Sequence, residues 1–213
     1  MIKPISMNLK EKLLGTPFFY QLFSSSVGLF GLSRLKLYAK YLPYTPGVKI
    51  LDLGCGPASS VKFFKSNDYL GIDVSNEYIN KAKSCHPDYN FQNIDFSTLN
   101  KASMLVPVGG FNLILAYGLI HHLSNDPVEL FFDKAYEVLA PGGHMVCFDG
   151  CLHENQSTVK KKIILADRGK FIRTSREYAS LAKKSNFVCE CTIEEKALLI
   201  PYSLHIMSAK KTL

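Results

Sequence analysis

The sequence feature that most constrains the fold is an alternation of short apolar segments with helical segments between residues 48 and 150. Such short apolar runs are typical of strands, and the residues between them have helical spacing. The predicted strands are Val48–Leu53, Tyr69–Asp73, Phe91–Asp95, Phe111–Tyr117 and His144–Asp149. Strands that alternate with helices form a parallel sheet covered by helices on both faces. The pattern therefore predicts an α/β protein.

Two helices have clear starting signals. Asp126 can cap a helix whose first residue is Pro127, and Glu129 completes a capping box. Thr174 and Glu177 form a second box of the same kind. We expect each of these helices to pack an apolar stripe against the sheet.

The C-terminal part of the chain predicts two more strands. Apolar and polar residues alternate from Phe187 to Ile193, and Leu198–Ser208 supplies a last strand. No helix separates these two segments, so we expect them to be antiparallel. The sheet then has about seven strands.

The 213 residues suit a single domain, which we divide into three segments. Residues 1–45 are expected to form a helical N-terminal lid, 46–150 a ligand-binding core, and 151–213 a substrate-side segment with the last two strands. Phe18, Phe19 and Tyr20 of the lid can cover the bound ligand or pack in the core.

Composition and charge exclude several protein classes. No apolar run is long enough to span a bilayer, and Met1–Lys12 lacks the apolar core of a signal peptide. We therefore predict a cytoplasmic protein. The six cysteines lack Cys-x-x-Cys spacing, so we expect reduced thiols and no metal site. The formal net charge of +7 is most simply explained by solvated lysine-rich faces.

The first strand leads into a glycine turn with the sequence Leu-Asp-Leu-Gly-Cys-Gly at residues 51–56. Gly54 and Gly56 let the backbone turn tightly and approach a ligand without a Cβ in the way. We expect a helix to follow, with free backbone N–H groups at its start.

This segment resembles motif I of the class I S-adenosylmethionine-dependent methyltransferases. The resemblance implies a Rossmann-like seven-stranded sheet, mostly parallel with the last strand antiparallel, and S-adenosylmethionine as the cofactor. It places Gly54 and Gly56 under the methionine part of the cofactor, and Asp52 beside the loop and the cofactor's amino group. Ala58 stands where a third glycine is common in the family, and we expect this small residue to do little harm.

Four later motifs follow in the order that the family has them. Asp73 ends the second strand, where an acidic group can accept two hydrogen bonds from a ribose diol. The resemblance implies that Asp95 accepts a bond from the adenine amino group and that Ile94 packs on the ring. Tyr117 ends the fourth strand and completes the expected cofactor-binding residues. The last motif is the Pro-Gly-Gly turn at residues 141–143, where we expect the preceding helix to stop.

A dehydrogenase is the main rival enzyme for a glycine-rich turn of this kind. Its fingerprint needs a third glycine at position 59, where this chain has Ser59. It also gives no account of the Pro-Gly-Gly turn. The sequence therefore favours a methyltransferase.

Candidates for proton transfer follow the fourth and fifth strands, because open α/β sheets bind ligands at the carboxyl ends of their strands. His121 and His122 follow the fourth strand, and His153 and Glu154 follow the fifth. A histidine titrates near neutral pH and can take a proton from a hydroxyl during methyl transfer. His121 and His153 are the predicted catalytic residues, and a structural role for these groups stays open.

A cluster of cations lies between Asp167 and Arg173. Arg168 and Arg173 can bind an anionic acceptor, because guanidinium groups grip carboxylates and phosphates with two hydrogen bonds. The alternative is that Asp167 pairs with one of these arginines and fixes the loop.

Three functions remain open at this point. We expect methyl transfer to a small-molecule acceptor, at an oxygen of a sugar, a lipid-linked glycan or another metabolite. The sequence lacks the Asn/Asp-Pro-Pro-Tyr/Phe pattern of many DNA and RNA amino-group methyltransferases and any attached RNA-binding module. DNA is therefore not an expected partner, and RNA or protein methylation rests on the positive charge alone. A cofactor-binding protein without catalysis is the third possible function. For the oligomeric state, we expect a monomer or a homodimer.

Overall fold

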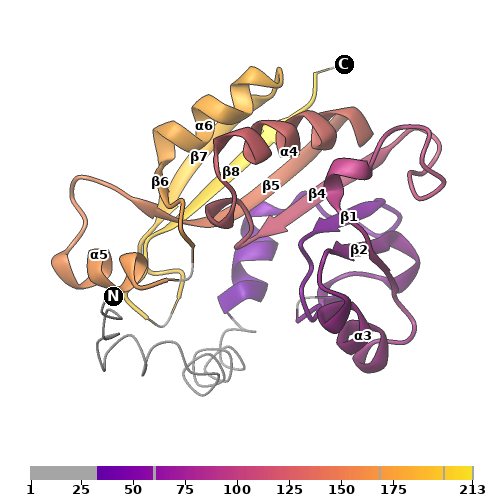
Figure 1. Cartoon of the computed structure of the whole chain (residues 1–213), viewed down its shortest axis with the longest axis horizontal. Coiled ribbons are helices and arrows are strands. Elements are labelled where there is room, and N and C mark those ends of the chain that lie inside the picture. Colours follow the sequence, from indigo (N-terminus) through magenta and orange to yellow (C-terminus); the bar gives the residue numbers. More distant parts are fainter. Residues whose placement is uncertain (1–32, 60, 168, 199, 213) are drawn as a thin grey trace, which may run out of the picture.

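The computed structural model describes residues 33–212 apart from 60, 168 and 199. Its centre is a twisted sheet with the strand order β3-β2-β1-β4-β5-β8-β7 (Figure 1). All neighbouring pairs are parallel except those of β8, which is antiparallel to both β5 and β7. The strands are β1 (Ile50–Leu53), β2 (Tyr69–Asp73), β3 (Asn90–Asn93), β4 (Phe111–Tyr117), β5 (Leu139–Leu152), β7 (Val188–Glu194) and β8 (Leu204–Lys210). The predicted fold class is confirmed, and a two-residue strand, β6 (Arg173–Thr174), is added beside the end of β5.

The parallel register brings the carboxyl ends of the strands to one edge. Leu53 at the end of β1 lies opposite Ile72 in β2 and Ala116 in β4. Tyr117 at the end of β4 lies opposite Phe148 in β5. The strand order reverses between β1 and β4, and ligands of open α/β sheets bind at such a switch point.

Helices cover both faces of the sheet, as predicted. Helix α4 (Asn125–Val138) and helix α6 (Ser175–Lys184) lie side by side on one face (Figure 1). The opposite face is covered by helical residues 33–41, helix α3 (Asn76–Cys85) and helix α5 (Thr158–Leu165), which contribute Leu37, Ile79 and Ile164 to its core. The predicted lid is helical at 33–41, and its residues 1–32, with Phe18, Phe19 and Tyr20, lie outside the described part. None of the described helices is long and apolar enough to cross a membrane.

The chain after β1 differs from the prediction, because no α-helix follows the glycine turn in the described residues. Short 3₁₀ helices, η1 (Val61–Phe63) and η2 (Ser66–Asp68), connect β1 to β2 instead. Ala58 adopts a left-handed conformation with φ +57°, and Val61 N–H donates to its carbonyl at 3.2 Å. A left-handed residue interrupts the right-handed α-helical path, so the turn closes with i to i+3 bonds.

Helix α4 also begins earlier than predicted. Ser124, not Asp126, is its N-cap residue, and Val128 N–H makes the first helical bond to Ser124 O at 3.1 Å. Pro127 therefore lies within the first turn. There the missing N–H costs no hydrogen bond, because the first turn's N–H groups lack helical partners.

Several predicted strand boundaries were also misplaced, and the last strand begins at Leu204 instead of Leu198. Strand β3 ends at Asn93, so Asp95 lies beyond it and caps the 3₁₀ helix η3 (Phe96–Thr98). Strand β5 begins at Leu139, before the Pro-Gly-Gly turn, and Leu139 already pairs with Phe111 of β4. The turn, in which Gly142 has φ +72°, forms an irregularity within the strand, after which His144 pairs with Leu113. The helix before it ends at Val138, as the turn residues indicated.

The capping box at the start of α6 is confirmed. Glu177 N–H donates to Thr174 Oγ1 at 3.3 Å, and Thr174 N–H donates to Glu177 Oε2 at 2.7 Å. The helix buries Tyr178, Leu181 and Ala182 against the sheet, as their spacing predicted.

We predict that Thr174→Ala lowers the free energy of unfolding by about 1 kcal/mol, because a helix N–H loses its acceptor. Urea unfolding followed by circular dichroism measures the change. Thr174→Ser keeps the hydroxyl and should stay close to the parent. Equal losses for both variants would show that the methyl group, not the cap, stabilises this helix.

Candidate active site

The glycine loop after β1 folds back over the end of β2. The N–H groups of Gly54 and Cys55 both donate to Ile72 O, at 2.9 and 3.0 Å. Gly54 has φ +68°, and a Cβ there would lie 2.9 Å from Leu119 Cδ1. Gly56 has φ +54°, and a Cβ there would meet no atom within 4 Å. The left-handed backbone favours glycine at both positions, and Gly56 also faces open space that a ligand can use.

Asp73 joins this loop to helix α3. Its Oδ2 accepts the Gly56 N–H at 3.0 Å, and its Oδ1 accepts the Ser75 N–H at 2.8 Å. The side chain is half-buried. A carboxylate oxygen accepts more than one hydrogen bond, so both oxygens can still receive a hydroxyl. The loop, the carboxylate and the open space beside Gly56 fit the ribose end of a nucleoside cofactor.

Asp52 is a buried carboxyl group at the same edge of the sheet. The Tyr69 hydroxyl donates to its Oδ2 at 2.6 Å. Burial raises the pKa of Asp52 to about 7, although the bond from Tyr69 and the charge of Arg34 oppose the shift. A buried carboxylate is stabilised by a nearby cation, so this position suits the positively charged methionine part of the predicted cofactor.

The predicted adenine-binding residues lie in the turn after β3. Asp95 is exposed, and its Oδ1 accepts the Ser97 N–H at 2.8 Å, which makes it the cap of η3. Ile94 is half-buried and packs against the core on the side of α4.

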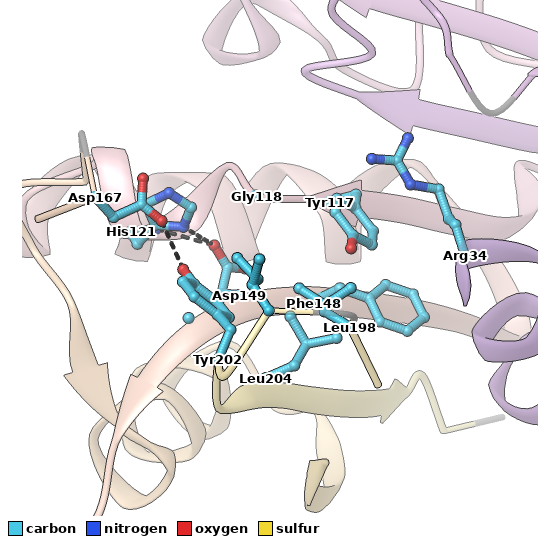
Figure 2. A pocket seen from close by; sticks show the side chains of 12 residues that line it. Arg34, Tyr117, Gly118, His121, Phe148, Asp149, Asp167, Leu198, Tyr202 and Leu204 are labelled. Carbon is cyan, nitrogen blue, oxygen red and sulfur yellow. Dashed lines mark hydrogen bonds and ion pairs between the residues drawn. The ribbon is translucent and has the colours of Figure 1, made fainter. Parts of the chain in front are cut away.

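A cavity of about 170 Å³ opens at the carboxyl ends of β4 and β5 (Figure 2). Its apolar wall comes from the segment before β8 and its start, through Leu198, Ile200 and Leu204. Its polar and aromatic wall is formed by Arg34, Tyr117, His121, Phe148, Asp149, Asp167 and Tyr202. This cavity is the candidate acceptor pocket.

His121 and Asp149 form a buried pair at the wall of this pocket (Figure 2). His121 Nδ1 lies 2.7 Å from Asp149 Oδ1, and the His121 backbone N–H donates to the same oxygen at 3.1 Å. Burial by itself lowers the pKa of His121, but the bond to Asp149 and the charges of Asp149 and Asp167 outweigh it and raise that pKa. A carboxylate only accepts, so Nδ1 carries the proton, and neutral His121 has its free lone pair on Nε2. Such a group can accept a proton.

The buried Arg173 side chain hydrogen-bonds to the backbone of the turn that carries His121. The guanidinium donates to Ile120 O at 3.3 Å, Phe171 O at 2.9 Å and Leu123 O at 2.8 Å. Its remaining bonds go to Asn125 Oδ1, at 3.2 and 2.8 Å. All of the guanidinium's donors therefore point into the protein.

The predicted anion site is wrong for Arg173, because this side chain is buried and its donors are used on backbone carbonyls and Asn125. Arg168 lies outside the described residues. Asp167 does not pair with Arg173 either. It accepts a bond from the Tyr202 hydroxyl at 2.6 Å at the edge of the pocket (Figure 2).

Tyr117 lies in the wall of the acceptor pocket. Its ring stacks on Phe148 at 5.4 Å between centroids, and the Arg34 guanidinium lies 4.2 Å from the ring centroid. Sequence reasoning missed Arg34 and Tyr202 as site residues, because they lie in no motif. It placed Asp149 at the ligand-binding end of the fifth strand but gave it no role.

The other two histidine candidates do not join His121 in the pocket. His122 is exposed, although its ring lies 4.2 Å from that of His121. His153 Nε2 lies 2.5 Å from Glu195 Oε1, and Glu195 also pairs with Lys160. His153 and the exposed Glu154 line a separate surface hollow. The described residues contain no group of three or more side chains that could hold a metal ion.

Comparisons with known proteins bear on the family and the fold of this chain. Residues 50–143 match a family described as "Methyltransferase domain". Phosphoethanolamine N-methyltransferase 3 of Arabidopsis thaliana is 26% identical over 160 residues, which are 74% of this chain and 32% of that protein. A ubiquinone biosynthesis O-methyltransferase of Bradyrhizobium is 31% identical over 51% of this chain and 42% of its own. Human N-acetylserotonin methyltransferase in complex with S-adenosylmethionine superposes with a TM-score of 0.66 at 18% identity, over 92% of this chain and 55% of that one.

Residues 50–143 thus match a methyltransferase domain, and the sheet has the mixed α/β architecture of the solved methyltransferases that superpose on it. The chain spans about a third of the length of the first of these relatives.

We predict that Arg173→Lys lowers the free energy of unfolding by about 3 kcal/mol, because one ammonium group cannot serve three carbonyls and Asn125. Urea unfolding measures the loss. Arg176→Lys, at an exposed position in the first turn of the following helix α6, is the matched control and should change stability by less than about 0.5 kcal/mol. Unchanged stability with a raised KM for the acceptor would return Arg173 to substrate binding.

Proposed function

We propose that this protein transfers a methyl group from S-adenosylmethionine to a small molecule, with His121 as the group that accepts the proton. The observation that carries the proposal is the buried His121–Asp149 pair in the wall of the pocket at the ends of β4 and β5. The class of the domain supports methyl transfer, and the small volume of the pocket supports a small acceptor or a short part of one.

The cofactor would be held by the residues at the ends of β1 and β2. The loop of Gly54 and Gly56 would pass under its methionine part, with open space at Gly56, while Asp52 offsets the positive charge there and Asp73 accepts the ribose hydroxyls. Asp95 and Ile94 would meet the adenine, and Tyr117 would border the reacting end. When bound, the cofactor supplies a methyl group on a sulfonium. Transfer from it requires alignment of donor and nucleophile more than any other help.

His121 acts on the acceptor side of the reaction. Its Nε2 takes the proton that an acceptor hydroxyl or ammonium loses, and Asp149 stabilises the resulting imidazolium. A hydroxyl gains most from such a base, because it is a weak nucleophile while it holds its proton. An oxygen acceptor is therefore the first candidate.

An amine acceptor is a second candidate that the pocket favours. The carboxyl groups of Asp149 and Asp167 and the rings of Tyr117 and Tyr202 surround the space, and such walls attract a cation. The names of several relatives specify phosphoethanolamine as the acceptor. Among the described residues that line the pocket, Arg34 carries a guanidinium group, whereas Arg173 does not line it. Arg34 therefore replaces Arg173 as the candidate contact for an anionic part of the acceptor. Mass spectrometry of products from matched alcohols and amines separates the two candidates.

RNA or protein methylation and cofactor binding without catalysis remain the alternatives. The first rests on the net charge of +7 and predicts salt-sensitive RNA binding. The second predicts no transfer to any of a panel of acceptors. Incubation of a cell extract with labelled cofactor, followed by mass spectrometry, tests all of these functions together.

We predict that Asp73→Ala weakens S-adenosylmethionine binding by about 10- to 100-fold, because hydrogen bonds to a charged group contribute about 1.5–3 kcal/mol. Titration calorimetry measures the affinity, and thermal unfolding checks that the fold is intact. Glu77→Ala, at an exposed site in the first turn of α3, is the control. An unchanged dissociation constant would reduce Asp73 to a group that organises the loop and α3.

We predict that His121→Ala lowers kcat by about 10²–10⁴-fold and leaves cofactor affinity almost unchanged. The parent's rate should rise with pH as His121 loses its proton. Because Asp149 raises the pKa of His121, the midpoint of that rise should lie above the ordinary histidine range. The rise should vanish in the variant.

His153→Ala is the comparison variant, since His153 lies outside the pocket and should keep the parent's pH profile. If His121→Ala keeps a near-parental rate between about pH 6 and 9 and His153→Ala does not, the assignment of the base is reversed. If both variants keep it, histidine base catalysis is wrong.

A further inference from the structure

A second buried histidine lies beside the His121–Asp149 pair. His205 in β8 and Asp149 in β5 are each about 1% exposed. In the part of the chain that the structure describes, Asp149 Oδ2 and both ring nitrogens of His205 have no hydrogen-bond partner. Buried polar atoms are nearly always paired, so three such atoms in one place call for a physical explanation.

The strand register places these atoms together. His205 lies directly opposite Asp149 in the antiparallel pair of β5 and β8. Side chains of directly opposed residues lie on the same face, with Cβ atoms about 4.5–5.5 Å apart. Both therefore project to the face that is covered by α6, where the His205 ring stacks on Tyr178 at 4.9 Å between centroids. Tyr178 in turn donates its hydroxyl to Gly150 O at 3.0 Å and is itself held in place.

The protonation state of His205 limits what it can do there. Burial lowers its pKa to about 4, against the opposing charge of Asp149, so the ring is neutral near pH 7. A neutral imidazole has one N–H donor and one acceptor nitrogen. Asp149 Oδ2 needs a donor, and a neutral His205 can provide one without forming an ion pair.

We propose that His205 is a positioning residue whose ring N–H donates, through one bridging water, to Oδ2 of Asp149. A buried water commonly makes two to four hydrogen bonds, and Asp149 Oδ2 and one ring nitrogen of His205 offer it two partners. The carboxylate is then held at both oxygens, by His121 at Oδ1 and by the water at Oδ2. His121 consequently keeps its proton on Nδ1 and its lone pair on Nε2. The link to catalysis rests on the proposed function, whereas the network itself does not.

The network has a consequence for the pKa of His121. A donor at Oδ2 withdraws charge from the carboxylate and makes Oδ1 a weaker partner for protonated His121. Loss of that donor should therefore raise the pKa of His121 further. The ionisable groups that face His121 are Asp149 from β5 and Asp167 from the segment after α5, with the His122 ring beside it. Those that face His205 are Asp149 and the Tyr178 phenol.

The test is an NMR titration of the full chain labelled with ¹⁵N in its histidine rings, without acceptor. His205→Phe keeps a ring for the stacking on Tyr178 but removes both nitrogens. His205→Gln keeps a donor and an acceptor. We expect the pKa of His121 to rise by about half to one unit in His205→Phe and to stay near the parent's value in His205→Gln. At one unit, kcat below that pKa falls about tenfold.

An unchanged His121 pKa in a folded His205→Phe variant would overturn the proposal. A merely structural role of His205 predicts lower activity at every pH without a shift of the profile. If His205→Phe does not fold, the test is made on the parent protein. Its NMR spectrum should show a cross-peak between the His205 ring N–H and a long-lived buried water. Absence of that cross-peak also overturns the network. A shifted His121 pKa combined with full activity of His121→Ala would instead refute the proposed function and leave the network standing.

Discussion

The parallel pairing of β4 with β5 is the constraint on which the candidate site depends. It sets Tyr117 opposite Phe148, so that the turn after β4 passes over the next residue of β5, which is Asp149. His121 then meets a carboxylate that is 28 positions away in the chain. Because the sheet also reverses its strand order beside β4, the glycine loop after β1 and the candidate acceptor pocket lie at the same edge.

Buried carboxyl groups define both halves of this edge. Asp52 at the end of β1 is paired with Tyr69, and Asp149 is paired with His121. Desolvation disfavours a buried charge, so each group needs donors or a cation beside it. At Asp52 we assign the role of the neighbouring cation to the positively charged cofactor. At Asp149 the donors are His121 and the proposed His205 network. The same physical requirement thus explains the pKa near 7 of Asp52 and the raised pKa of His121.

Arg173 illustrates how burial changes the meaning of a residue. Its place in a cationic loop suggested a contact with an anionic acceptor. In the fold it is 7% exposed and bonds the carbonyls of the turn around His121. The side chain still acts as a fork of planar donors, but its acceptors are backbone oxygens that would otherwise be buried unpaired. It therefore supports the site without entering it.

The sequence by itself determined the features that depend on neighbouring residues. The strand alternation, the left-handed glycines of the loop, the capping box at Thr174 and the antiparallel return of the last strand all follow from local preferences and short connections. The prediction of a helix after the glycine turn was wrong, because Ala58 takes a left-handed conformation that its residue type does not favour. Only the tertiary structure decided which charged residues are buried and which of them meet. In the fold, His121 meets Asp149, and Arg34 and His205 lie near them, whereas His153 pairs with Glu195 outside the pocket. Local sequence does not encode these contacts, because they depend on packing between segments that are far apart in the chain.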